Sequence, residues 1–160
     1  MRLTEIVLAT VLMSVSVLAQ ACDLAPVKIV QSVGKVDDVT VNFGEADDPN
    51  HPIAWQGPLQ IATGAAPACS VNDEVSIIEQ PVMFGDGVLY VSTYSGSNNR
   101  IYALDAKTCK TIWRSGSFST KPVFKKRKIV MGGKTVLIDK HCRPIALRDN
   151  SSTSSTQLEK

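Results

Sequence analysis

The sequence predicts an all-β protein built from short antiparallel meanders, and the segment 81–114 gives the strongest support. In this segment, three apolar runs rich in β-branched and aromatic residues alternate with turn signals, a pattern typical of strands joined by tight turns. A second, degenerate copy follows at 122–148. The chain has 160 residues, of which 44% are hydrophobic and 20% charged, so it is long enough to form one core.

The segment 81–114 divides into strands and turns as follows. Strands are predicted at 88–91, 101–104 and 111–113. Gly85-Asp86-Gly87 precedes the first strand as a hairpin turn, because glycine adopts positive φ without steric cost. Turns at 95–99 and at Asp105–Cys109 separate the remaining strands. Asp105 and its counterpart Asp139 are interpreted as turn formers.

The second copy repeats the order of the first. Pro81-Val82 recurs as Pro122-Val123, and Leu89–Val91 recurs as Ile129–Met131, at a period of about 40 residues that is typical of repeat proteins. Cys69 precedes the first copy about as far as Cys109 precedes the second. We therefore expect Cys69 to mark the same turn of an earlier unit, giving about three units between residues 22 and 148.

The part before the first copy carries weaker signals. Strands are predicted at 27–33, 39–43 and 58–63, with a turn at Gly34-Lys35 and another at 64–68. The loop 45–52 contains oxygen and nitrogen donors: Glu45, Asp47, Asp48, Asn50 and His51. Their spacing does not match a calcium-binding EF-hand loop. We interpret this segment as a solvated acidic loop rather than a cation site.

The N-terminus predicts export. Arg2, an apolar run from Ile6 to Ala19 and the small-residue site at Ala19–Ala21 form a secretory signal peptide over 1–21. Cleavage there leaves Cys22 first in the mature chain, which resembles a bacterial lipoprotein with an acylated cysteine. Leu18 lies one position too early for the usual lipobox, so a soluble periplasmic or secreted protein and a lipid-anchored one both remain open. Residues 22–149 form the predicted domain, and the Ser/Thr-rich tail 150–160 is expected to be disordered.

The first copy resembles the repeat of PQQ-like β-propellers. The resemblance rests on Val88–Val91, on Tyr102–Ala106 and on Ile112-Trp113. It implies blade-like antiparallel meanders, with Tyr102 and Trp113 packed between neighbouring blades. We expect Trp113 to be buried between sheets. About three units are too few to close a propeller, which needs about four to eight blades.

The four cysteines predict disulfides. An even number of cysteines in an exported chain indicates a disulfide framework, and four allow three pairings. Cys109 stands where the PQQ-like repeat has glycine. A disulfide is the simplest explanation for a cysteine at that position. The disulfide candidates are Cys69, Cys109 and Cys142, while Cys22 is the candidate for lipidation. No CxxC motif is present, and the spacing does not favour zinc.

Charge is unevenly distributed along the chain. Residues 22–99 carry a net charge of −8 and residues 100–160 a net charge of +10, although the whole chain is only +2. The strongest cluster is Lys125, Lys126, Arg127 and Lys128, expected on an exposed hairpin turn. It is either a solvated turn or a contact for an anionic membrane or polysaccharide surface. No nucleic-acid partner is expected, since stacking aromatics are lacking beside the cluster.

No catalytic constellation emerges from the sequence. His51 and His141 do not combine with a serine and an aspartate into a convincing triad, and no cofactor or metal site is predicted. The first hypothesis is therefore a non-enzymatic binding or scaffold module of the bacterial envelope, acting through contacts with another envelope protein. The alternative is a remnant or subunit of a PQQ-dependent quinoprotein dehydrogenase. That family's adjacent cysteine pair is missing from this chain.

Overall fold

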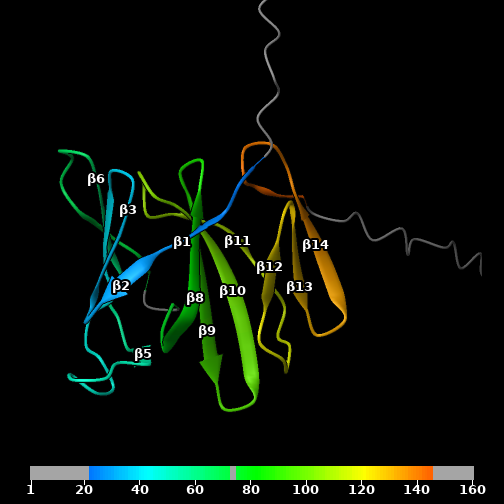
Figure 1. The fold of residues 1–160 in the computed structure, drawn as a ribbon, viewed down its shortest axis with the longest axis horizontal. Coiled ribbons are helices and arrows are strands. Elements are labelled where there is room, and N and C mark those ends of the chain that lie inside the picture. Colours follow the sequence, from blue (N-terminus) through cyan, green and yellow to red (C-terminus); the bar gives the residue numbers. More distant parts are fainter. Residues whose placement is uncertain (1–21, 73–74, 146–160) are drawn as a thin grey trace, which may run out of the picture.

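Three antiparallel sheets form the fold. The computed structural model describes residues 22–72 and 75–145. The sheets stand side by side in chain order, and none of them closes into a barrel (Figure 1). No α-helix occurs in the described residues, so the predicted all-β class is confirmed. The predicted signal peptide at 1–21 and the tail at 150–160 lie outside the described residues.

The first sheet contains the N-terminal strands. Its spatial order is β2 (Lys28–Val30), β3 (Val33–Val36), β4 (Val39–Asn42), β6 (Gln60–Thr63) and β7 (Cys69–Ser70). The turn expected at Gly34-Lys35 is wrong: Gly34 lies inside β3, and the turns fall at 31–32 and 37–38. A Cβ atom at Gly34 would lie 2.6 Å from Val27 Cγ1 and 2.8 Å from Phe43 Cε2. Close packing, rather than a turn, therefore requires glycine there.

The middle sheet contains the longest strands. Its order is β1 (Ala25–Pro26), β8 (Ile78–Gly85), β9 (Val88–Ser95), β10 (Asn98–Asp105) and β11 (Thr111–Arg114), with β5 (Ala54–Trp55) also pairing with β8. The turn at 86–87 lies where the sequence predicted it, and both Asp86 and Gly87 have positive φ. β1 and β5 are the exceptions to sequence order: β1 comes from the N-terminus and pairs with β8 at Ala25↔Phe84, and β5 comes from between two strands of the first sheet.

The third sheet is the second copy of the meander. Its order is β12 (Val123–Lys125), β13 (Lys128–Met131), β14 (Lys134–Ile138) and β15 (Pro144–Ile145). Its strands alternate between one buried and one exposed face, as expected for a sheet covered on one side. Ile129 and Met131 point towards the middle sheet, while Lys128 and Val130, which alternate with them, lie on the opposite face.

Two hydrophobic clusters hold the sheets together. One lies between the first and middle sheets and includes Val41, Phe43, Trp55, Leu89 and Leu104; the other lies between the middle and third sheets and includes Tyr90, Ile101, Ala103, Ile129 and Ile138. The middle sheet is therefore apolar on both faces. Each fully buried aliphatic or aromatic side chain stabilises the fold by about 1.5–3 kcal/mol relative to exposure.

Tyr102 and Trp113 contribute to different clusters. Tyr102 is buried against the first sheet. Trp113 faces the third sheet but is only half-buried, so the expectation that it is buried is wrong in degree. Trp113 lies on β11 at the edge of the middle sheet, where fewer side chains are available to cover an indole.

Each disulfide joins neighbouring sheets. Cys69–Cys109 joins β7 of the first sheet to the turn before β11, and Cys22–Cys142 joins the segment that leads into β1 to the turn before β15. Cys109 and Cys142 both have a φ of +56°, so they occupy a glycine-like turn position. Cys69 has no positive φ and begins a strand, so it does not mark the same turn.

The disulfide to Cys142 also bears on the fate of Cys22. The Cys22 sulfur is bonded to Cys142, and a sulfur in a disulfide leaves no thiol for acylation. The lipoprotein alternative for Cys22 therefore gains no support from the structure. The sequence-based expectation of a disulfide among Cys69, Cys109 and Cys142 is met by the Cys69–Cys109 bridge.

Candidate functional site

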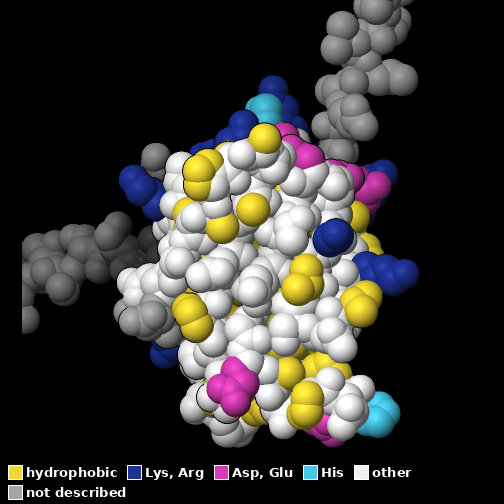
Figure 2. Space-filling model, turned by 90° about the vertical axis from the view of Figure 1, so that its left-hand side faces the viewer, with side chains coloured by type: hydrophobic (Ala, Val, Ile, Leu, Met, Phe, Trp, Pro, Cys, Tyr) yellow, Lys and Arg dark blue, Asp and Glu magenta, His cyan; other side chains and the backbone are white. Residues whose placement is uncertain are grey.

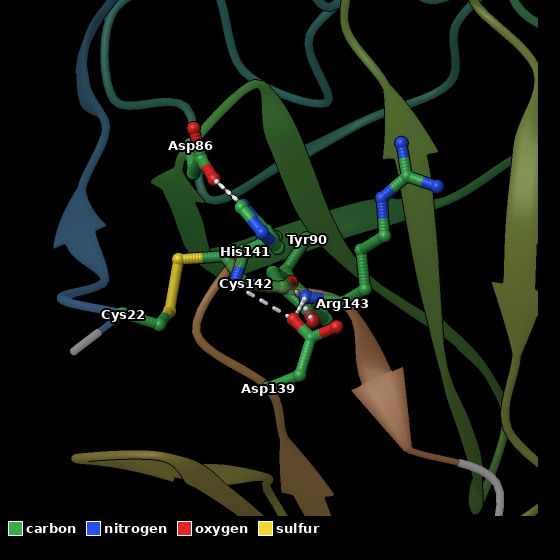
Figure 3. Close-up of a disulfide and its surroundings, with 7 residues drawn as sticks. All are labelled: Cys22, Asp86, Tyr90, Asp139, His141, Cys142 and Arg143. Carbon is green, nitrogen blue, oxygen red and sulfur yellow. Dashed lines mark hydrogen bonds and ion pairs between the residues drawn. A yellow bond between two sulfur atoms is a disulfide. The ribbon is translucent and has the colours of Figure 1, made fainter. Parts of the chain in front are cut away.

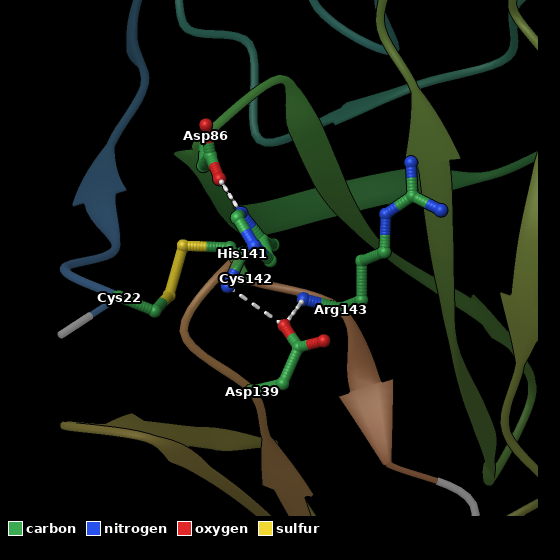
Figure 4. Close-up of polar contacts among 6 residues, drawn as sticks. All are labelled: Cys22, Asp86, Asp139, His141, Cys142 and Arg143. Carbon is green, nitrogen blue, oxygen red and sulfur yellow. Dashed lines mark hydrogen bonds and ion pairs between the residues drawn. A yellow bond between two sulfur atoms is a disulfide. The ribbon is translucent and has the colours of Figure 1, made fainter.

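The last turn of the third sheet lies against the hairpin of the middle sheet (Figure 3). Asp139 forms this turn: one carboxylate oxygen accepts the backbone N–H groups of His141 and Arg143, each at 2.8 Å. His141 Nδ1 lies 3.0 Å from a carboxylate oxygen of Asp86 on the β8–β9 hairpin (Figure 4). A disulfide, a turn-forming carboxylate and a cross-sheet pair thus fix the third sheet in place.

Tyr90, on β9 of the middle sheet, also contacts this turn. Its hydroxyl donates a hydrogen bond of 2.6 Å to the backbone carbonyl of Cys142, and its side chain is fully buried (Figure 3). Burial, reinforced by the negative charge of Asp139, raises the pKa of the Tyr90 phenol well above its usual range. The phenol therefore stays a neutral donor, and its role in this contact is structural.

An open groove lies where the turn ends of the sheets meet. Its volume is about 560 Å³, and its charged lining consists of Asp37, Asp38, Asp86, Asp105, Lys107 and Arg143. The Asp105 carboxylate is already engaged by the backbone N–H groups of Lys107 and Thr108. The prediction that Asp105 and Asp139 form turns is confirmed. The groove mixes both signs of charge and contains no nucleophile paired with a base.

The acidic loop is held together by its own carboxylates. Asp47 accepts hydrogen bonds from the backbone N–H groups of Ile53 and Ala54, and Asp48 accepts those of Asn50 and His51. The bonds from Ala54 and Ile53 lower the pKa of Asp47. These oxygens face the loop backbone, which agrees with a solvated loop.

The described residues contain no group of three or more His, Cys, Asp or Glu side chains that could hold a metal ion. Within the described ranges, no helix is long and apolar enough to span a membrane.

The basic cluster occupies the β12–β13 hairpin, as the sequence predicted. Lys125 ends β12, Lys128 begins β13, and Lys126 and Arg127 form the turn between them. All four side chains are exposed. Lys125 and Lys128 are direct cross-strand partners, an arrangement in which like charges destabilise a sheet.

The two end sheets of the stack each have one uncovered face, which the sequence analysis did not identify. The first end face is the outward side of the first sheet, with Lys28, Val30, Val33, Lys35, Thr40, Asn42, Gln60 and Ala62. The third end face is the outward side of the third sheet, with Val123, Lys125, Lys128, Val130, Thr135, Leu137 and Ile145. In the sequence, these faces correspond to every second residue of the strands. The strand pairing that brings those residues together on one face is known only from the fold.

The first end face is mostly uncharged. Figure 2 views the molecule from this side and shows scattered hydrophobic side chains among uncharged atoms, with few charged groups. Val30 is 62% exposed and Val33 39%. No family model matches the chain, and no curated protein matches it. The uncovered end faces are therefore the features from which a function can be argued.

Proposed function

We propose that the protein is a non-enzymatic binding module of the bacterial cell envelope that acts through protein–protein contacts. The observation that carries the proposal is the first end face, where exposed valines lie among uncharged polar side chains and beside a single lysine pair, Lys28 and Lys35. The centres of protein interfaces are likewise depleted of charge and enriched in apolar contact. Val30 at 62% exposure is the most accessible apolar side chain of this face.

The edge of the same sheet offers a second kind of contact. β2 is the edge strand of the first sheet and has three residues. Edge strands carry backbone groups that can pair with a strand from another protein. A partner strand that pairs with β2 would place its own side chains beside Val30 on the same face.

Two further features support the envelope as the location. Disulfides persist in oxidising compartments outside the cytoplasm, and two of them join the three sheets. The N-terminal segment has the composition of a signal peptide. The blade-like meanders resemble the PQQ-like repeats that the sequence suggests, and we keep membership of that family as part of the proposal.

Site-specific photo-cross-linking tests the proposal. A photoreactive residue at Val33 in the mature, oxidised protein should yield one saturable product with an envelope protein, and unlabelled protein should compete for it. The same group at Ser97, on the exposed β9–β10 turn, is the matched control. Equal products from both positions, or none from Val33, would contradict the proposal. The substitution Val30→Glu, made in the protein that carries the photoreactive residue at position 33, should abolish the specific product, because Val30 is the cross-strand neighbour of that position.

A further inference from the structure

The third end face combines cations and exposed aliphatic side chains in one plane. The register places Lys125, Lys128, Leu137 and Ile145 in a single row across the four strands. Directly paired residues lie on the same face of a sheet. Val123, Val130 and Thr135 form the next row on that face.

The aliphatic side chains of this face are unusually open. Val123, Leu137 and Ile145 are 48%, 46% and 42% exposed. Leu137 is the cross-strand partner of Lys128, and Ile145 is the partner of Leu137 on the next strand. Apolar side chains next to a cluster of cations are typical of proteins that bind at the interfacial region of a bilayer.

The four cations form no ion pair within the described chain, although Asp23 lines a small pocket together with Lys125 and Lys126. The ion pairs found there involve Lys121 with Glu79 and His141 with Asp86, and none includes residues 125–128. The fold thus keeps four neighbouring cations exposed, with two of them directly opposed across the hairpin.

The first end face differs from the third in the charge of the turn beside it. It also has a cross-strand lysine pair, Lys28↔Lys35, and two exposed valines. Its neighbouring hairpin turn, however, is Asp37-Asp38, so two carboxylates offset the two cations. The equivalent turn of the third sheet is Lys126-Arg127, which adds to the positive charge instead.

We propose that the third end face docks on the surface of an anionic phospholipid bilayer. Lys125, Lys128 and the turn cations would meet lipid phosphates, while Leu137 and Ile145 would enter the boundary between head groups and acyl chains. A bilayer supplies both environments in one surface and requires no matching shape from a short, flat sheet. This inference rests on the proposed envelope location, and it leaves the first end face free for a protein partner.

Sedimentation with vesicles tests this docking with purified components alone. The mature, oxidised protein should sediment with phosphatidylcholine vesicles containing about 30% phosphatidylglycerol at low salt and much less with phosphatidylcholine alone. Binding should fall at least about tenfold in about 0.5 M NaCl, because salt screens the exposed cations.

Two matched variants assign the effect to one face. K125E/K128E should lose binding at least about tenfold, because each cation near an anionic surface contributes substantially. K28E/K35E makes the same change in net charge on the opposite end face and should stay within about twofold of the unmodified protein. Leu137→Ser should weaken binding without altering its salt dependence.

Several outcomes would overturn the inference. These are no sedimentation with anionic vesicles, equal loss in the two charge variants, or binding that salt does not weaken. Binding of the unmodified protein to poly-glutamate but not to vesicles would assign the face to an acidic polypeptide instead. The salt series needs no variant, so misfolding of K125E/K128E would not obscure the answer. A protein cross-link at Val33 is measured independently, so the two proposals can fail separately.

Discussion

Among the described residues, Trp55 is the largest side chain that is completely buried. It lies in the hydrophobic cluster between the first and middle sheets. It is 1% exposed, its Nε1–H donates a 2.8 Å hydrogen bond to the Gln31 carbonyl, and its ring lies 5.4 Å from that of Phe43. Trp113, the tryptophan that the repeat pattern emphasised, is half-buried. Trp55 is therefore expected to contribute more to the free energy of unfolding than Trp113.

The two tryptophans should differ clearly in stability measurements. Trp55→Ala should cost about 3–5 kcal/mol, since it leaves a large cavity and an unpaired carbonyl. Trp113→Ala should cost about 1–2 kcal/mol, because its side chain is half-exposed. Urea denaturation of both variants checks this, and an equal or reversed order would contradict the assignment.

Tyr90 should make the stability of the protein sensitive to alkaline pH. Its pKa is raised in the folded state, so the neutral phenol stabilises the fold below the unfolded pKa of about 10. That stability is lost as pH rises above about 10, because the unfolded chain then releases the proton more readily.

The substitution Tyr90→Phe isolates this contribution. At neutral pH it should cost about 1–2 kcal/mol, since the buried Cys142 carbonyl loses its donor. Above about pH 10 the variant should lose less stability per pH unit than the unmodified protein. Parallel alkaline profiles in denaturation experiments would show that Tyr90 is not the group responsible.

At the scale of elements, the strands were predictable and their partners were not. Strands β9, β10, β11 and β13 follow local runs of apolar residues flanked by turn residues, so the sequence predicted them. Gly34 was misassigned because a glycine required by packing looks the same in sequence as a glycine required by a turn. The pairing of β1 with β8 joins residues more than fifty positions apart, and no local pattern reports it.

The same limitation applies to the cysteines. Cys109 and Cys142 were recognisable because they stand at glycine-like turn positions. Cys22 was a candidate for lipidation because its neighbours partly resemble a lipobox, whereas its disulfide depends on β1 reaching the middle sheet. Gly85 shows how tight that approach is, since a Cβ atom there would lie 2.6 Å from the Cys142 sulfur.

Peptide mapping of the exported protein should therefore find Cys22 linked to Cys142. Intact mass before and after reduction should indicate two disulfides and no attached acyl chains. Recovery of an acylated Cys22 together with a free Cys142 would contradict this structure and restore the lipoprotein alternative.

The two disulfides should also differ in their effect on stability. They span sequence separations of 120 and 40 residues, and loop-closure entropy gives about 5 kcal/mol for the longer and about 4 kcal/mol for the shorter. C22A/C142A should thus be less stable than C69A/C109A in denaturant melts. A clear reversal would mean that native-state contacts, rather than the unfolded chain, decide the order.

At the scale of the whole molecule, the three sheets form an open stack. Its two end faces differ from each other, and neither is suited to binding another copy of the chain. The middle sheet is apolar on both sides, while the end faces carry polar and charged side chains, as terminal units of stacked repeats do. Each end face bears a cross-strand lysine pair. Bringing the two ends together, as a ring of several copies requires, would place four lysines and the cationic turn of the third sheet together, with the two carboxylates of Asp37-Asp38 offsetting only part of this charge.

The mass of the oxidised mature protein in solution is the most direct test of this account. Sedimentation equilibrium over a range of protein and salt concentrations should give the mass of a single chain throughout, because the end faces repel their own copies and remain available to other partners. A mass of two or more chains at low salt, where lysine repulsion is strongest, would contradict the open stack and show instead that copies of the chain complete one another.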